Sequence, residues 1–298
     1  MRFAGEFAAL GTAVCWAFGS NLFAAAGQRM GSVVLNRLRL TVAMLLLGTA
    51  LLVTHGSPWP TWATSAQVTL LALSGLVGFV FGDLYYFRAL VILGPGRAAL
   101  ITSMSPIFTL LIGWPVLGEK PGPLVLLGVA LILGGITWVL LESERGRRPH
   151  VEGSVTVGIV AGVLAAVGQA GGYVLSKMAM RTGIDPLSGT VIRVVAATVG
   201  IWLLAALQRD VGRSLGALRD GRAAAFMAGG AFFGPFLGVT LSLAALQFVE
   251  AGVAAAITSI YPVLTLALSS HFHHERFTLR NLLGALVAAA GVVVLFLR

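Results

Sequence analysis

One stretch of the sequence occurs twice. Residues 98–106 read AALITSMSP and residues 254–262 read AAAITSIYP, a shift of 156 positions. The chain of 298 residues is therefore two copies of one unit, and its fold must be one that two similar units build together. The same shift pairs Gly78 with Gly234, Gly82 with Gly238, Gly96 with Gly252, Glu119 with Glu275, Lys120 with Arg276, Gly128 with Gly284 and Gly135 with Gly291.

The repeated unit is too apolar for a water-soluble domain. Hydrophobic residues make up 57% of the chain and charged residues 10%, whereas a soluble domain carries about 25% charge. The net charge of +9 comes from basic residues that sit singly between apolar runs, which excludes the basic stripe of a nucleic-acid-binding protein. Cys15 is the only cysteine, so an intramolecular disulfide and a cysteine-based zinc cluster are excluded. The composition predicts a protein of the lipid bilayer.

Apolar segments long enough to span a bilayer, which takes about 20 residues, divide the chain evenly. Turn-forming Gly and Pro clusters separate several of them. The most polar stretch, residues 142–153, is interpreted as a linker between a first repeat at 1–141 and a second at 154–298. The ten predicted helices cover residues 5–26, 33–54, 65–92, 96–118, 122–141, 154–179, 187–207, 222–248, 251–271 and 278–297.

An odd number of helices in each repeat has a topological consequence. The second repeat must enter the membrane from the opposite side, which makes the two units inverted repeats. The predicted fold class is thus an all-α polytopic membrane protein with two inverted five-helix repeats around a central cavity. Such symmetry suits a secondary transporter that works by alternating access; a channel or a membrane enzyme has less need of it.

Basic residues distinguish the two sides of the predicted bundle. Most arginines, including those of residues 142–153 and 208–222, fall on the side opposite the two termini. Because positive charge favours the cytoplasmic side, this bias predicts that both termini lie outside the cytoplasm.

The repeated block before Pro106 and Pro262 is the best candidate for a substrate site. A proline inside a helix frees a backbone carbonyl, which in hydrocarbon must face a neighbouring helix or a wet cavity. The two prolines are therefore predicted as hinges, and the hydroxyls before them as a polar wall suited to a small zwitterion or amphiphile. The alternative is that these hydroxyls bind backbone carbonyls and join helices. The wall consists of Thr102, Ser103 and Ser105 in the first copy and Thr258, Ser259 and Tyr261 in the second.

Asp83 is the most deeply placed carboxylate, and Val239 takes its position in the second copy. An ionisable residue in a spanning segment is a functional-site hypothesis. Two alternatives stay open: a role in proton coupling or substrate binding, and an ion pair with Arg39, Arg88 or Arg193. Snorkelling towards the membrane interface accounts for Arg39 and Arg193 without a function.

Other helices offer further candidates. Trp16, Gln169 and Tyr173 are predicted either to line the same cavity or to pack between helices. A small residue at every fourth position in Ser74, Gly78 and Gly82, and again in Gly230, Gly234 and Gly238, is typical of close helix packing.

His271, His273 and His274 suggest a metal site, and with it an alternative function as a membrane enzyme or metal-handling protein. Three imidazoles alone define no coordination geometry, and only the following Glu275 recurs in the first copy, so we assign no metal and no cofactor. The sequence contains no nucleophile elbow, zinc-protease motif or phosphate-binding loop, which argues against hydrolysis and ATP-driven pumping.

Several of these motifs occur together in one family. The duplicated five-helix unit, the proline of its fourth helix, the following Gly-Glu-Lys or His-Glu-Arg, and residues 16–21 (WAFGSN) resemble the EamA-type branch of the drug/metabolite transporter superfamily over essentially the whole chain. The resemblance implies ten helices arranged as a basket in the bacterial inner membrane, working as a monomer to export amino acids, aromatic ones included, and related metabolites. In exporters of aromatic amino acids from that branch, bulky aromatics stand where this chain has Ser103 and Ser105, a difference that predicts a roomier pocket. Members of the branch commonly have cytoplasmic termini, in contrast to the arginine bias.

Overall fold

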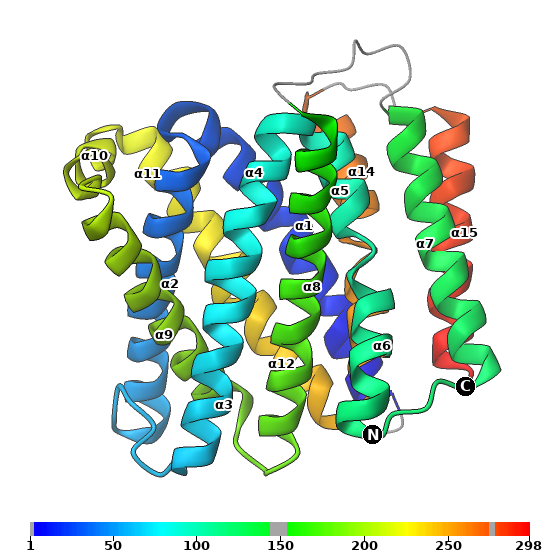
Figure 1. The fold of residues 1–298 in the computed structure, drawn as a ribbon, viewed down its shortest axis with the longest axis horizontal. Helices are drawn as coiled ribbons and strands as arrows, with labels where there is room; N and C mark the ends of the chain where they lie inside the picture. The colour runs from blue at the N-terminus through cyan, green and yellow to red at the C-terminus, as the bar shows by residue number, and fades with distance from the viewer. Residues whose placement is uncertain (1–2, 144–153, 274–277) are drawn as a thin grey trace.

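Long helices run between the two ends of the molecule (Figure 1), and the computed structural model describes residues 3–143, 154–273 and 278–298. The first repeat consists of α1 (Ala4–Met30), α2 (Ser32–His55), α3 (Ser65–Gly75), η1 (Leu76–Gly82), α4 (Asp83–Leu93), α5 (Pro95–Thr102), α6 (Ser105–Leu117) and α7 (Pro123–Ser143). The second consists of α8 (Val155–Met180), α9 (Pro186–Leu207), α10 (Val211–Gly216), η2 (Ala217–Arg219), α11 (Gly221–Ala231), η3 (Phe232–Gly238), α12 (Val239–Phe248), α13 (Ala251–Thr258), α14 (Tyr261–His273) and α15 (Leu279–Phe296).

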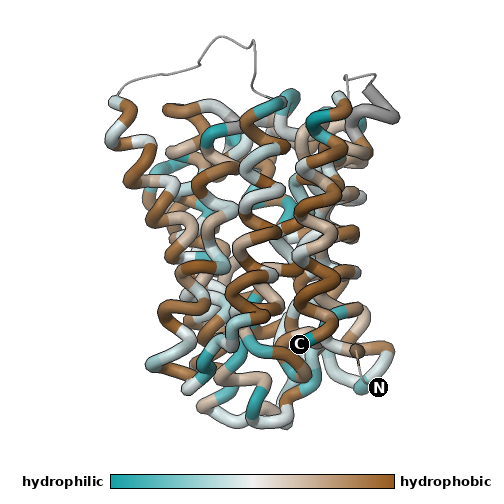
Figure 2. Tube along the Cα trace, turned by 90° about the vertical axis from the view of Figure 1, so that its right-hand side faces the viewer, coloured by the Kyte–Doolittle hydropathy of each residue, from teal (hydrophilic) through white to brown (hydrophobic). Residues whose placement is uncertain are grey.

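Within the described ranges these elements make ten segments that are long and apolar enough to cross a membrane, which confirms the predicted number. α3, η1 and α4 form one span, and α11, η3 and α12 form its counterpart. The described residues contain no strand. Hydrophobic residues predominate along the helices, whereas hydrophilic residues gather in the loops at the ends (Figure 2), as expected of a protein that faces lipid along its sides.

The two repeats run in opposite directions. α1 starts at the end of the molecule where the C-terminus also lies, and α8 starts at the opposite end, where α7 finishes (Figure 1). The structure therefore has the inverted arrangement that an odd number of helices requires.

Each repeat interrupts its third span with a π-helical segment at the same register. η1 covers Leu76–Gly82 and η3 covers Phe232–Gly238, which the sequence shift of 156 superimposes. In a π-helix the backbone bonds from i to i+5, which widens the turn, and such segments are often found at functional sites.

The first helix of each repeat crosses the π-helical segment of the other repeat. On α8, a Cβ added at Gly172 would lie 3.2 Å from Gly78 Cα, and one added at Gly168 would lie 2.9 Å from Gly82 Cα. On α1, a Cβ at Gly19 would lie 3.2 Å from the Gly234 nitrogen. Only glycine permits these backbone approaches, so the structure confirms that the small residues of the third and eighth spans are packing faces.

The last helices of the two repeats, α7 and α15, stand together at one edge of the bundle (Figure 1). Their glycines interlock: a Cβ at Gly135 would lie 2.5 Å from Gly284 O, and one at Gly291 would lie 2.7 Å from Gly128 O. This pair forms a symmetric frame beside the helices that carry the candidate site.

Candidate functional site

The proline block divides its helix in two in both repeats. α5 ends at Thr102 and α6 begins at Ser105; α13 ends at Thr258 and α14 begins at Tyr261. Pro106 and Pro262 therefore lie in the first turn of the second half-helix. Backbone N–H groups in a first turn have no carbonyl partner within the helix, so proline costs no hydrogen bond there. The sequence predicted a proline within a continuous helix, whereas the structure places each proline immediately after a break.

Most of the hydroxyls before the breaks bond to backbone carbonyls. Ser103 Oγ donates to Ala99 O at 2.7 Å, and Ser259 Oγ donates to Ala256 O at 2.7 Å. Thr102 Oγ1 donates to Ala98 O at 2.9 Å, and Thr258 Oγ1 to Ala9 O of α1 at 3.5 Å. Their donors are thus engaged, while their second lone pairs can still accept a hydrogen bond.

Ser105 and Tyr261 differ from the other four. They occupy the same position in the two repeats, and both are half-buried. Within the described part of the chain, neither side-chain hydroxyl makes a hydrogen bond. Tyr261 lies within electrostatic range of Asp83 and Arg39. The residue just before each proline is therefore the member of the wall with a hydroxyl available to a ligand.

A buried ion pair lies beside this wall. Asp83, the first residue of α4, follows η1 directly, and its Oδ2 lies 2.5 Å from Nη2 of Arg39 on α2. Arg39 Nε donates to Asn36 Oδ1 at 2.7 Å, and the guanidinium lies 5.3 Å from the ring centre of Phe23. Asp83 is 7% exposed and Arg39 is 8% exposed. Of the three arginines considered as partners, the structure pairs Asp83 with Arg39.

The interfacial interpretation of Arg39 and Arg193 is wrong, because both side chains are buried inside the bundle. Arg193 of α9 is 3% exposed, and its guanidinium stacks on the ring of Phe79 in η1 at 4.6 Å. Their places near the ends of the predicted helices suggested snorkelling to the interface, but α2 and α9 turn these side chains towards the π-helical spans instead.

The candidates on α1 and α8 converge on the π-helical segments. Trp16 packs on η3, where a Cβ added at Gly234 would lie 3.2 Å from its ring, and it also lies 5.9 Å from the Arg39 guanidinium. Gln169 Nε2 is 3.5 Å from Gly78 O of η1. Tyr173 Oη accepts a hydrogen bond from Ser242 Oγ of α12 at 3.1 Å. The structure thus places Trp16 near the Arg39 guanidinium. Gln169 meets η1 of the other repeat, whereas Tyr173 bonds to α12 of its own repeat.

Sequence reasoning missed Asn36, Phe23 and Phe79. Asn36 lies three residues before Arg39 on α2, a spacing at which helical side chains meet, so a search around each buried charge would have found it. The two phenylalanines carry no such signal, because an aromatic residue in a spanning helix usually packs against lipid or other helices.

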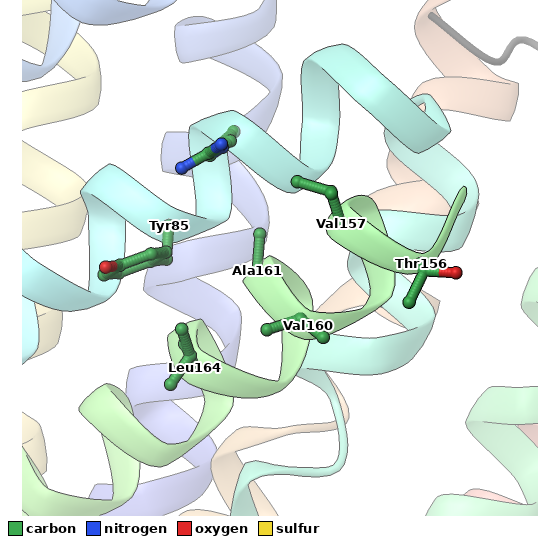
Figure 3. A pocket seen from close by; sticks show the side chains of 7 residues that line it. Tyr85, Thr156, Val157, Val160, Ala161 and Leu164 are labelled. Carbon is green, nitrogen blue, oxygen red and sulfur yellow. The ribbon is translucent and has the colours of Figure 1, made fainter. Parts of the chain in front are cut away.

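Two surface hollows lie away from the predicted polar wall. One, of about 170 Å³, lies between α4 and α8 and is lined by Tyr85, Arg88, Thr156, Val157, Val160, Ala161 and Leu164; Figure 3 shows its apolar side chains on α8 facing Tyr85. The other, of about 370 Å³, is lined by residues of α3, η1 and α9 and by Trp59. Neither contains a member of the predicted polar wall.

The histidine cluster falls largely outside the described residues. His271 and His273 lie in the last turn of α14, with side chains that are not described, and His274 and Glu275 lie outside the described ranges. Among the side chains that are described, no group of three or more His, Cys, Asp and Glu residues is placed to hold a metal ion.

Comparisons with known proteins agree with the fold. The EamA-like transporter family matches residues 3–141 and, a second time, residues 156–297. No curated protein matches the chain. The crystal structure of another protein has the same fold with a TM-score of 0.74 and 16% identity, over 99% of this chain and 96% of that one. Because the family match covers nearly the whole sequence, the chain belongs to the EamA-like transporter family.

Proposed function

We propose that this protein is a secondary carrier that exports amino acids and related small metabolites from a bacterial cell by alternating access. Its solute would bind between the proline-broken helices, with Ser105 and Tyr261 as hydroxyl contacts and Thr102, Ser103, Thr258 and Ser259 as further acceptors. Trp16, Gln169 and Tyr173 would contact the solute from α1 and α8, and the breaks before Pro106 and Pro262 would act as hinges. Family membership supports transport, and the small Ser103 and Ser105 support a broader range than aromatic amino acids.

One observation carries the proposal: equivalent half-helices of the two repeats differ in burial. In the second repeat every residue from 253 to 260 is buried. At the equivalent positions 97–104 of the first repeat, only Ala98 and Ser103 are buried, and Arg97 and Met104 are exposed. The bundle is thus more tightly closed around α13, which starts at the end that holds the termini (Figure 1). An inverted repeat can exchange the two environments, which would open that end and close the other.

Specific contacts hold the closed end together. Glu119, just after α6, accepts a hydrogen bond from the Ala251 nitrogen at the start of α13 at 2.8 Å, and it pairs with Arg181 at 2.9 Å. Gly252 packs directly on the side chain of Leu110 in α6. Transport requires these contacts to part and re-form.

Flux into liposomes tests the proposal. The purified protein, reconstituted with each labelled amino acid in turn and with an imposed pH gradient, should carry at least one of them; absence of flux for every amino acid and metabolite tried would remove the carrier proposal. The alternative of an enzyme or metal-handling protein has no supporting observation among the described residues, and a metal stoichiometry near zero would remove it.

Alternating access is tested separately by a cross-link. Leu110→Cys with Gly252→Cys, in a Cys15→Ala background, should form a disulfide that stops flux until a reductant is added. The control pair, Gly128→Cys with Leu295→Cys, joins α7 to α15 in the frame and should leave flux intact. Unchanged flux in the cross-linked α6–α13 variant would contradict the proposed motion.

The orientation remains a proposal: residues 142–153 and 208–222 in the cytoplasm, and both termini outside. Single cysteines in these loops should resist a membrane-impermeant thiol reagent in intact cells. Ready labelling would support cytoplasmic termini instead.

A further inference from the structure

Arg193 differs from the other buried charged residues of the described chain in having no polar partner. Arg39 pairs with Asp83, Arg37 with Asp210, and Glu6 with Arg298, while Lys177 donates to two backbone carbonyls. None of the hydrogen bonds and ion pairs within the described residues involves Arg193, and its Nε is fully buried without a partner. A buried charge without a partner is strongly unfavourable, so a group from outside the described chain is expected to complete the site.

The packing around Arg193 holds its guanidinium in one orientation. The face of the group lies on Phe79, the central residue of the span Ser65–Leu93, at 4.6 Å. Its Nη2 lies over two facing glycines: a Cβ added at Gly78 would be 3.0 Å from it, and one at Gly172 would be 3.1 Å from it. Gly75 brings the α9 backbone close enough for this arrangement, because a Cβ there would collide with the Arg193 carbonyl. The guanidinium is thus positioned near the middle of the span, with its donors unused.

The surrounding charges select an anion. Asp83 and Tyr173 lie within electrostatic range of Arg193, but Asp83 is already in contact with Arg39. Arg39, Asp83 and Arg193 together carry one net positive charge. A planar guanidinium with free N–H groups matches a carboxylate through two parallel hydrogen bonds.

We propose that Arg193 binds the carboxylate of the transported solute, an inference that rests on the proposed transport function and narrows its substrate class to carboxylates. Gln169 lies three residues before Gly172 on α8, and Tyr173 lies within electrostatic range of Arg193, so two further predicted contacts lie near the bound carboxylate.

Thermal protection of the detergent-purified protein tests this inference without measuring transport. The probes are L-alanine, L-threonine and L-phenylalanine, their C-terminal amides, and N-acetyl-L-phenylalanine, which keeps the carboxylate and lacks the ammonium group. At least one acid should raise the melting temperature, and its amide should need about tenfold or more higher concentration, since a hydrogen bond to a charged group is lost. Equal protection by acid and amide, or protection by none of the acids, would overturn the inference.

Variants of Arg193 distinguish binding from a structural role. Arg193→Gln should melt at or above the temperature of the empty wild type, because it removes an unpartnered charge, and should lose the preference for acids over amides. Arg193→Lys should keep a weakened preference for acids, because lysine retains the positive charge but lacks the two parallel N–H donors of the guanidinium. The matched control is Arg39→Gln, which should melt lower because it leaves Asp83 unpaired. If Arg193→Gln melts well below the wild type and keeps the preference, Arg193 is structural and the inference is wrong.

Measurements of flux allow the carboxylate site at Arg193 and the proposed transport function to be tested independently. Wild-type flux of amides or amines equal to that of the acids would refute carboxylate recognition and leave the carrier standing. Selective protection by the acids without any flux would refute the carrier and leave the Arg193 site standing.

Discussion

The two repeats share their backbone and differ in their charges. η1 and η3 cover equivalent positions, and each is crossed by the first helix of the other repeat. At the position that follows, the first repeat has Asp83 and the second has Val239, and both side chains are buried. Arg39 pairs with Asp83, whereas Arg193 has no hydrogen-bond or ion-pair partner in the described chain. The two repeats therefore share the arrangement of their helices but differ in the buried charged residues that the helices carry.

The half-helices before the prolines differ in the same way. α5 and α13 have the same length and register, but residues 253–260 are all buried and most of residues 97–104 are not. An exact two-fold arrangement would give equal burial. Unequal burial at equivalent positions is what an inverted repeat shows when one of its two ends is closed.

The largest effect is expected at the charge that distinguishes the repeats. Asp83→Asn keeps the size of the side chain and leaves the Arg39 guanidinium buried without a counter-charge. Breaking a buried pair in this way costs about 3–5 kcal/mol, so the purified protein should unfold at a much lower temperature. A double variant with Arg39→Gln should recover part of the loss, which a double-mutant cycle measures.

The same variant distinguishes a structural pair from a coupling group. If Asp83 exchanges a proton during transport, Asp83→Asn should remain stable, keep downhill exchange and lose pH-dependent accumulation in liposomes. A stable variant with full pH dependence would show that Asp83 is neither the coupling group nor an essential partner of Arg39.

Leucine substitutions should have different effects in the two copies of the polar wall, because the copy in the second repeat is more deeply buried than the copy in the first. Ser259 is buried, so Ser259→Leu must overpack its site and should destabilise the protein by about 1–3 kcal/mol. Ser105 is half-buried with a free hydroxyl, so Ser105→Leu should fold normally and lose most of its flux. Melting temperature and liposome flux, measured on both variants, test the difference.

Thr49→Leu provides the control for these substitutions. Thr49 is exposed on α2 and, like Ser259, donates to a carbonyl of its own helix, Leu45 O at 2.9 Å. A lipid-facing site tolerates leucine, so both stability and flux should be unchanged. Full flux in Ser105→Leu would show that this wall faces away from the solute path.

The frame formed by α7 and α15 should respond equally in the two repeats. A methyl group at Gly135 meets the backbone at Gly284 and Ala288, and one at Gly291 meets the backbone at Gly128 and Ile132. Gly135→Ala and Gly291→Ala should therefore each cost about 1–3 kcal/mol. Gly134 has open space around it, so Gly134→Ala should be neutral or slightly stabilising. Melting temperatures that differ strongly between Gly135→Ala and Gly291→Ala would contradict a symmetric frame.

The repetitive and apolar parts of the fold could be predicted from the sequence. The ten spans, the inverted repeats and the packing role of Gly78 and Gly82 follow from hydropathy, an odd helix count and small-residue spacing. The π-helical segments were not predicted, although Pro235 inside η3 is a signal of an irregular helix; η1 contains no proline. The break before Pro106 could be predicted only in part, because a proline also occurs in helices that are kinked but continuous.

The candidate site could be predicted less completely. Asp83 stood out as a carboxylate in an apolar run, but three arginines were equally placed to pair with it. The choice of Arg39 depends on how α2 rotates towards η1, and helix rotation is set by packing between spans that are distant in sequence. The same rotation buries Arg193 against Phe79, which the pattern of α9 alone does not indicate.

The smallest effect is expected at an ion pair on the more open end. Arg29 in the last turn of α1 lies 2.7 Å from Asp220, which caps α11, and both side chains are substantially exposed. The hydrogen bond from Arg29, and a second from the Ala223 backbone, hold the pKa of the Asp220 carboxyl below its usual range. A carboxyl with a depressed pKa stabilises the folded state above its unfolded pKa of about 4 and loses that contribution as the pH falls through the folded value.

Arg29→Gln should therefore lower the melting temperature only slightly at pH 7, and the difference from the wild type should shrink as the pH falls below about 4 and through the lowered pKa of the Asp220 carboxyl. High salt should reduce the difference at pH 7, because exposed pairs are screened. Arg213→Gln, an exposed arginine of α10 without an ion pair in the described chain, should show neither dependence. The contact also bridges the two repeats at the end opposite the Glu119–Arg181 pair, so it resists further opening there. A variant lacking Arg29 that melts much lower at pH 7, or whose deficit does not shrink as the pH falls below about 4, would show that this end depends on Arg29 for more than a screened surface contact.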